Sequence, residues 1–162
     1  MSVAIEIAVE AGDWAELPGA IPWVRRAVKA ALADARVRGG ELGVVLTDDT
    51  HIRALNRQWR TKDESTNVLS FPSPQTRDTG TPLIGDVVLA FETLMREARS
   101  EGKEAEHHLA HLAVHGVLHL LGHDHDDDKK AERMENRERA ILVRLGVPDP
   151  YAADRAAGGR IS

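Results

Sequence analysis

The sequence predicts an α/β fold with α+β character, in which helices cover a small, mixed, four-stranded sheet. Strand-like and helix-like patterns alternate through the first ninety or so residues, and the pattern is helical after that. The chain has 162 residues, of which 42% are hydrophobic. That length is enough for one hydrophobic core and too short for two ordinary domains. We therefore expect a single domain over residues 1–151.

Two strands and a helix are predicted in the first part of the chain. Residues 3–9 place β-branched side chains at every second position, which is typical of a strand buried mainly on one face. Residues 23–38 repeat apolar side chains at the helical spacing, which indicates an amphipathic helix. A glycine pair ends that helix, and residues 41–46 are predicted to form the second strand.

The next predicted helix, residues 48–59, begins at Asp48, a favoured N-cap residue, and has two distinct faces. The apolar face comprises Ile52, Leu55 and Trp59. The other face carries Arg53, Arg57 and, just beyond the helix, Arg60. Arginine stripes are usually solvated surfaces, but guanidinium groups also bind phosphate oxygens through two parallel hydrogen bonds. The residues alone leave both interpretations of the basic face open.

The remaining elements are two strands followed by three helices. The predicted strands span residues 67–71 and 83–91, and the proline- and glycine-rich segment between them is expected to be a mobile loop. The predicted helices span residues 92–100, 104–121 and 129–145. The small, polar residues 152–162 are expected to form a disordered tail.

Histidines are spaced for metal binding at the end of the long helix. His115 and His119 are four residues apart, so they lie about 40° apart on one helix face. Gly122 favours the left-handed conformation that closes a helix, which lets the chain turn and bring His125 back. Three neutral imidazoles with an open fourth position are typical of catalytic zinc, whereas structural zinc sites usually include cysteine, which this chain lacks. We expect His115, His119 and His125 to bind one divalent transition metal, with zinc preferred, on a central helix.

The spacing H-x-x-x-H-x-x-G-x-x-H is shared with the metzincin metalloproteases, in which a glutamate after the first histidine is the general base. Gly116 occupies that position here. The spacing therefore indicates a metal, while the missing carboxylate disfavours peptide hydrolysis. A solvated, histidine-rich helix face is the alternative, but glycine within a helix costs roughly 1 kcal/mol and requires a reason.

Residues 110–125, AHLAVHGVLHLLGHDH, resemble the signature of the YbeY family of bacterial metal-dependent endoribonucleases. Further similarity lies in four shorter blocks, residues 55–63, 66–72, 84–88 and 146–151. Together these blocks span most of residues 40–151. The resemblance implies a zinc-dependent endoribonuclease that prefers single-stranded RNA and acts in ribosomal RNA maturation and ribosome quality control. It also implies the same fold, with ribosomal RNA or the small ribosomal subunit as the partner.

The resemblance leaves several assignments open. The family usually has tyrosine where this chain has His123, so His123 and His125 compete as the third ligand. His111 is expected to be a hydrogen-bonded neighbour or a surface residue in preference to a ligand. Either a metal-activated water or the neighbouring 2′-hydroxyl could attack the phosphorus, and the first requires no additional protein base. The rival functions are a zinc peptidase, disfavoured by Gly116, and a non-enzymatic metal-bearing factor that associates with the ribosome.

The overall charge does not indicate nucleic-acid binding. The chain has 21 basic and 26 acidic residues, which gives a formal net charge of −5, so a phosphate-binding surface must be local. Given the resemblance, Arg60 is the best candidate for a residue acting on the substrate phosphate, beside the three histidines. The N-terminal residues do not resemble an export signal, and no long apolar run is present. We expect a cytoplasmic protein that binds neither membranes nor DNA, with an oligomeric state the sequence does not indicate.

Overall fold

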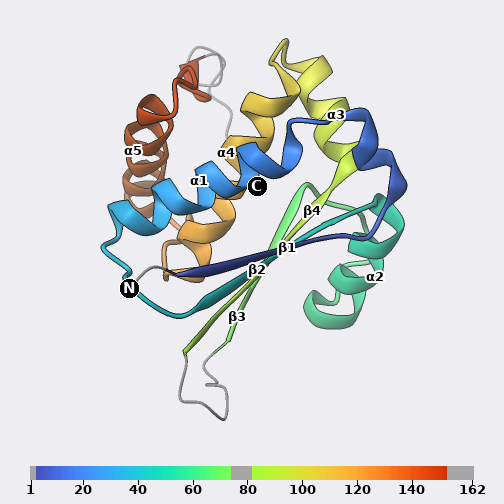
Figure 1. Cartoon of the computed structure of the whole chain (residues 1–162), viewed down its shortest axis with the longest axis horizontal. Helices are drawn as coiled ribbons and strands as arrows, with labels where there is room; N and C mark the ends of the chain where they lie inside the picture. Colours follow the sequence, from blue (N-terminus) through green and yellow to red (C-terminus); the bar gives the residue numbers. More distant parts are fainter. Residues whose placement is uncertain (1–2, 74–81, 153–162) are drawn as a thin grey trace.

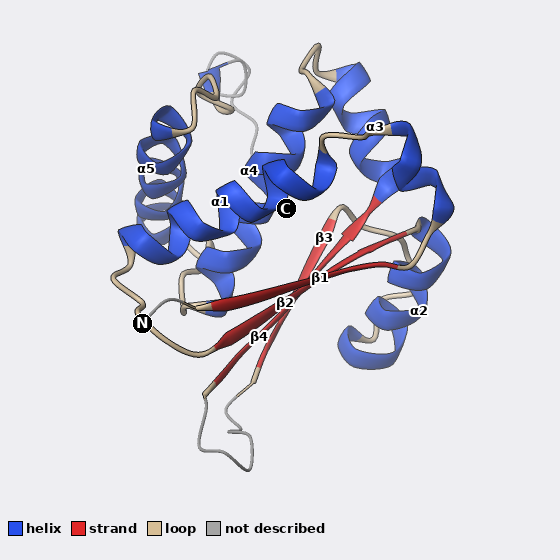
Figure 2. Ribbon diagram, viewed as in Figure 1, coloured by secondary structure: helices blue, strands red, loops and turns tan. Residues whose placement is uncertain are grey.

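The computed structural model describes residues 3–73 and 82–152. A four-stranded sheet crosses the molecule, with helices on both of its faces (Figures 1 and 2). The strands are β1 (Ala4–Val9), β2 (Glu41–Thr47), β3 (Val68–Pro72) and β4 (Leu83–Ala90), in the spatial order β1-β2-β4-β3. β1, β2 and β4 are parallel, and β3 is an antiparallel edge strand. The predicted mixed, four-stranded sheet is therefore confirmed.

Five α-helices and one short 3₁₀ helix occur in the described part of the chain. They are η1 (Gly12–Glu16), α1 (Ala20–Asp34), α2 (Asp49–Arg60), α3 (Phe91–Ser100), α4 (Ala105–Leu120) and α5 (Asp128–Arg144). α1 begins earlier than predicted and includes Pro22, which is tolerated because N–H groups in a first turn have no helical partner. It also ends earlier, since Arg36 adopts a left-handed conformation with φ 59°. The loop tip at 74–81 and the predicted tail over 153–162 lie outside the described residues.

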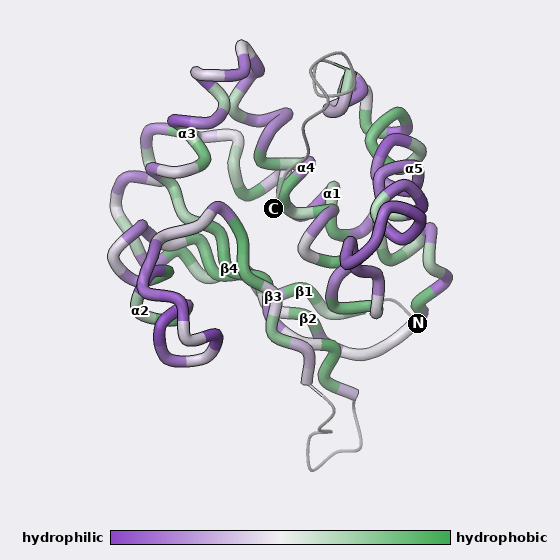
Figure 3. Tube along the Cα trace, turned by 180° about the vertical axis from the view of Figure 1, so that it is seen from behind, coloured by the Kyte–Doolittle hydropathy of each residue, from purple (hydrophilic) through white to green (hydrophobic). Residues whose placement is uncertain are grey.

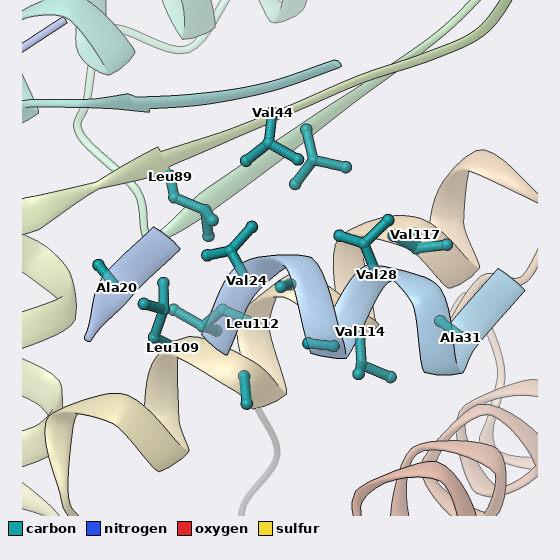
Figure 4. Packing of buried hydrophobic residues seen from close by; sticks show 14 of the residues in the cluster. Ala20, Val24, Val28, Ala31, Val44, Leu89, Leu109, Leu112, Val114 and Val117 are labelled. Atoms are coloured by element: carbon teal, nitrogen blue, oxygen red, sulfur yellow. The ribbon is translucent and has the colours of Figure 1, made fainter. Parts of the chain in front are cut away.

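The main core lies between one face of the sheet and the helices α1 and α4. Val24 and Val28 of α1 and Leu112 of α4 pack beneath Val44 and Leu89 of the sheet (Figure 4). α5 packs outside α1 and α4, and Figure 3 shows that it has long hydrophilic stretches, whereas the strands are mainly hydrophobic. α4 is buried almost all round, as expected for a central helix.

The opposite face of the sheet is covered by α2, over a much smaller apolar cluster. Ile52 is fully buried there and Leu55 is partly buried. Trp59, the third residue of the predicted apolar face of this helix, is 64% exposed. Of the three residues on that face, only Ile52 and Leu55 belong to this apolar cluster.

No helix among the described residues is long and apolar enough to span a bilayer.

Candidate metal centre

The last turn of α4 and the loop after it bring three histidines together. α4 ends at Leu120, and Gly122 takes φ 98°, a conformation that glycine adopts without strain. The N–H of His123 donates to the carbonyl of Leu118, which closes the helix end and directs the following residues back. The chain then places the ring of His125 5.1 Å from that of His119, centroid to centroid.

The nitrogen atoms of these rings lie at distances that suit one metal ion. One ring nitrogen from each of His115, His119 and His125 lies within 4.8 Å of the other two. The Nε2 atoms of His115 and His119 are 3.2 Å apart. Two nitrogens held at about 2.0–2.1 Å from a tetrahedral zinc ion would be separated by about 3.3 Å, so the observed spacing fits zinc. The donor set therefore matches the group that the sequence indicated.

Burial keeps the second of these imidazoles neutral. The pKa of His119 is lowered to about 4, first by burial and then by the neighbouring His115 and His125. A neutral imidazole retains the lone pair that a metal needs, whereas an imidazolium does not. At pH 7 His119 is thus in the form required for a ligand.

Glu138 of α5 forms hydrogen bonds with two buried histidines of α4, His111 and His115. The sequence did not identify it as a site residue. Its side chain is fully buried and accepts hydrogen bonds from His111 Nε2 at 2.7 Å and from His115 Nδ1 at 3.1 Å. The Tyr151 hydroxyl donates to its two oxygens at 2.8 and 3.0 Å. Burial acts to raise the Glu138 pKa, but the hydrogen bonds from both histidines outweigh it and lower the pKa to about 2.

This carboxylate determines which nitrogen of His115 can bind a metal. An ionised carboxylate only accepts hydrogen bonds, so the proton of His115 must be on Nδ1. The lone pair is then on Nε2, the atom that faces His119. The sequence contained one signal for this role, because Glu138 lies on the same helical face as the buried Met134 and Ile141.

The structure also places the residues whose roles were left open. His111 is buried against Glu138 and Tyr151, as the preferred interpretation of a hydrogen-bonded neighbour requires. His123 is absent from the group of three in the described structure, and His125 occupies it. Between His123 and His125, the carboxylate of Asp124 accepts a hydrogen bond from the N–H of Asp126 at 3.3 Å, which is the contact of a turn residue.

A cavity of about 760 Å³ opens beside the three histidines, which form part of its wall. Arg60 and Lys62 line it as well, and so do Glu97 of α3 and Glu101, the residue that follows α3. One Nη atom of Arg60 donates to the carbonyl of Ser70 at 2.9 Å, which fixes the guanidinium at the cavity.

The three arginines of the predicted basic face of α2 do not all line the cavity. Arg53 is paired with Asp63 at 2.8 Å on the surface, away from the cavity lining. Arg60 alone of the three arginines reaches the cavity wall. The structure therefore brings all four predicted site residues, Arg60, His115, His119 and His125, to one cavity.

Gly116 is required by packing against the sheet. A Cβ atom there would lie 2.6 Å from Val87 Cγ1 and 3.2 Å from Val68 Cγ2. The Ser70 hydroxyl donates to the Gly116 carbonyl at 2.8 Å, which holds α4 close to β3. A side chain at this position would point at the strands, so the glutamate of the metzincins has no room here.

We expect Gly116→Ala to lower the free energy of unfolding by about 1–3 kcal/mol, as overpacking of a filled core does. The gain in helix propensity, about 1 kcal/mol, opposes this and does not cancel a 2.6 Å contact. Urea unfolding of the metal-free protein measures the change. Gly39→Ala, where an added Cβ meets nothing within 4 Å, is the control. A Gly116→Ala protein at least as stable as the original would contradict this account of the close approach.

Comparison with known proteins identifies the family. A family model described as Endoribonuclease YbeY matches residues 13–146. A relative from Rhodopseudomonas palustris, named Endoribonuclease YbeY, is 52% identical over 152 residues, which cover 91% of this chain and 80% of the relative. A relative of the same name from Azorhizobium caulinodans is 51% identical, with 91% and 96% covered.

The fold is also similar to a solved structure. The solution structure of TM1509 from Thermotoga maritima has a TM-score of 0.58 and 24% sequence identity, and the match covers 94% of this chain and 93% of that one. At that identity the likeness bears on the fold alone. The family model and the relatives at about half identity go further, and they confirm the resemblance seen in the sequence: this chain belongs to the Endoribonuclease YbeY family.

Proposed function

We propose that this protein is a metal-dependent endoribonuclease that cuts single-stranded RNA during ribosomal RNA maturation. The observation that carries the proposal is a group of three imidazoles opening on a cavity that Arg60 also lines. A metal and a guanidinium at one cavity provide two positive groups for a phosphodiester. The names of the relatives support RNA as the substrate.

His115, His119 and His125 would hold one divalent transition metal, with zinc preferred. Three neutral imidazoles suit zinc and related ions, whereas magnesium and calcium prefer oxygen ligands. When bound, the ion would supply positive charge at the scissile phosphate and lower the pKa of an attacking oxygen. Which metal is native is decided by metal analysis of the purified protein.

Arg60 would bind a phosphate oxygen of the substrate. Its hydrogen bond to the Ser70 carbonyl occupies one Nη atom and leaves the other N–H groups of the guanidinium for a phosphate. Because that bond fixes the side chain before the substrate arrives, less conformational entropy is lost on binding. Lys62, which also lines the cavity, would add a positive charge for the phosphate but lacks the planar, two-pronged geometry of a guanidinium.

The proposed activity is tested by offering the zinc-loaded protein four substrates under identical conditions. They are a single-stranded oligoribonucleotide, the same sequence as a duplex, the DNA equivalent and an unstructured peptide. We expect internal cleavage of the single-stranded RNA, loss of cleavage on chelation and recovery on adding metal. Peptide cleavage would favour the zinc peptidase, and stoichiometric metal with no turnover would favour the non-enzymatic factor.

Arg60→Ala should lower the rate of RNA cleavage by about 10²–10³-fold, as expected when one charged group on a transition state is removed. Arg60→Lys keeps the charge but loses the two-pronged geometry, so its rate should fall between those of the two proteins. Metal content should be unchanged in both variants, since Arg60 is not one of the three proposed metal ligands. Single-turnover cleavage, with metal content measured in parallel, tests this. Equal rates for Arg60→Ala and the original protein would remove Arg60 from the mechanism.

We further propose that the enzyme acts in the cytoplasm on precursor ribosomal RNA, in contact with the small ribosomal subunit, and contributes to ribosome quality control. The family of the chain supports this placement. Co-sedimentation of the protein with small subunits, compared with free protein, is the measurement. A protein that remains at the top of the gradient would contradict the ribosomal partner and leave the cleavage activity untouched.

A further inference from the structure

Four large hydrophobic side chains are well exposed among the described residues. They are Val9, Ile21, Trp59 and Val143. Single exposed aliphatic side chains are common on protein surfaces and require no explanation. Trp59 differs from the other three because it is an aromatic residue next in sequence to Arg60, which lines the cavity.

The last turn of α2 places Trp59 beside the cavity wall. Asn56 and Arg60 both line the cavity and are four residues apart, so they mark the helix face turned toward it. Trp59 is three residues after Asn56, about 60° round the helix from it. The indole therefore lies at the border of the cavity-facing stripe.

The end of the helix places a second cation, Lys62, in the lining of the same cavity. Thr61 adopts φ 57° and closes α2. The N–H of Lys62 then donates to the Asn56 carbonyl, and Lys62 joins the cavity lining. Arg60 and Lys62 thus follow Trp59 closely in sequence, and both line the cavity. An exposed aromatic ring next to cations that line a cavity is an arrangement that binds single-stranded nucleic acid.

The charges around the cavity favour the end of α2 as the path of a polyanion, because Arg60 and Lys62 line it there with two positive charges against the one negative charge of Glu64. Another part of the lining, contributed by α3 and the residue after it, carries Glu97 and Glu101, whose carboxylates lie within 4.8 Å of each other. Lys103 pairs with Glu101 at 2.7 Å, which reduces the negative charge there without reversing it. A phosphodiester chain is repelled by the remaining charge and attracted by Arg60 and Lys62. A strand entering the histidine end of the cavity therefore passes over the end of α2.

We propose that Trp59 is a stacking platform for a base of single-stranded RNA, adjacent to the nucleotide whose phosphate is held at Arg60. This inference rests on the proposed function and specifies how its substrate binds. The indole stacks on a base face while Arg60 and Lys62 contact the neighbouring phosphates. Every base has such a face, so the contact favours unpaired RNA without selecting a sequence.

The test measures binding of a single-stranded oligoribonucleotide with chelator present, so that the RNA stays intact. Trp59→Ala should weaken binding by about 5- to 150-fold, the effect expected for one lost base stack. Trp59→Phe keeps an aromatic face and should stay within a few-fold of the original. Trp59→Leu keeps apolar bulk without the face and should behave like alanine. Because Trp59 is 64% exposed, these variants are expected to fold normally, which a thermal scan checks.

Two controls separate stacking from a general surface effect. Val143→Ala removes an exposed apolar side chain from α5 and should leave RNA binding unchanged. The second control is a series of RNAs, each with a single abasic nucleotide at a different position. At one of these positions, loss of the base should weaken binding to the original protein as much as Trp59→Ala does. At that position the abasic change should have no further effect on Trp59→Ala, because both changes remove the same contact.

Intrinsic fluorescence gives a direct signal, since Trp14 is buried and Trp23 is only partly exposed. Stacking should quench the Trp59 emission on adding RNA, and Trp59→Phe should lose that quench while still binding. Binding by Trp59→Ala within twofold of the original would overturn the inference. If the original protein cleaves RNA while Trp59→Ala binds normally, the stacking proposal fails and the enzyme proposal stands. Absence of cleavage by the original protein would instead reject the enzyme proposal.

Discussion

His125→Ala is expected to lose most of its bound metal, whereas His123→Ala, altered only two residues earlier, should keep about one ion per chain. The ring of His125 lies 5.9 Å from that of His115 and 5.1 Å from that of His119, and His123 does not belong to this group. Loss of one of three donors should weaken binding by more than the roughly 10- to 100-fold typical of losing a ligand's hydrogen-bond partner.

Metal content after dialysis, followed by a chelator competition at pH 7, measures the difference between these two variants. RNA cleavage should disappear with the metal in His125→Ala and persist in His123→Ala. His115→Ala and His119→Ala should behave like His125→Ala. Retention of metal by His125→Ala together with its loss from His123→Ala would show that the third ligand is misassigned.

Glu138→Gln should weaken metal binding by about 10- to 100-fold, although Glu138 contacts no metal in this proposal. The carboxylate accepts from Nδ1 of His115 and thereby holds the lone pair on Nε2. The glutamine amide can present N–H groups to the same atom, which permits the wrong tautomer. Chelator competition on the folded protein measures the affinity, and urea unfolding of the metal-free form measures stability. Removing a charge from a buried, paired position should also lower that stability by about 3–5 kcal/mol.

A matched control for this variant exists on the same histidine helix. Glu97, which is partly exposed, accepts from Nε2 of the buried His108 at 2.9 Å, so the two form a second histidine–carboxylate pair that does not involve the three ligands. Glu97→Gln should leave the affinity for metal within about twofold. Tyr151→Phe removes only the hydroxyl that donates to Glu138 and should weaken metal binding less than Glu138→Gln. Unchanged metal affinity in a folded Glu138→Gln protein would make this carboxylate purely structural.

Several parts of the fold and site could be predicted because they depend on residues close together in the chain. Alternating apolar side chains identified the strands, and the helical repeat identified the helices within a few residues of their ends. The metal group was recognisable because one helix turn and one glycine turn span only residues 115–125. Local spacing determines much of the geometry there, since one helix turn and the turn at Gly122 bring the three residues together.

The remaining features depend on which segments pack together, and only the tertiary structure decided them. Trp59 matched the apolar stripe of its helix, yet the apolar cluster beneath that helix does not include it and its side chain is exposed. In the sequence, Glu138 is one of many charged residues of α5. It is buried with His111 and His115 because α5 packs on α4. A helical repeat shows which side chains share a face, but the burial, ionisation and partners of that face depend on elements far away in the sequence.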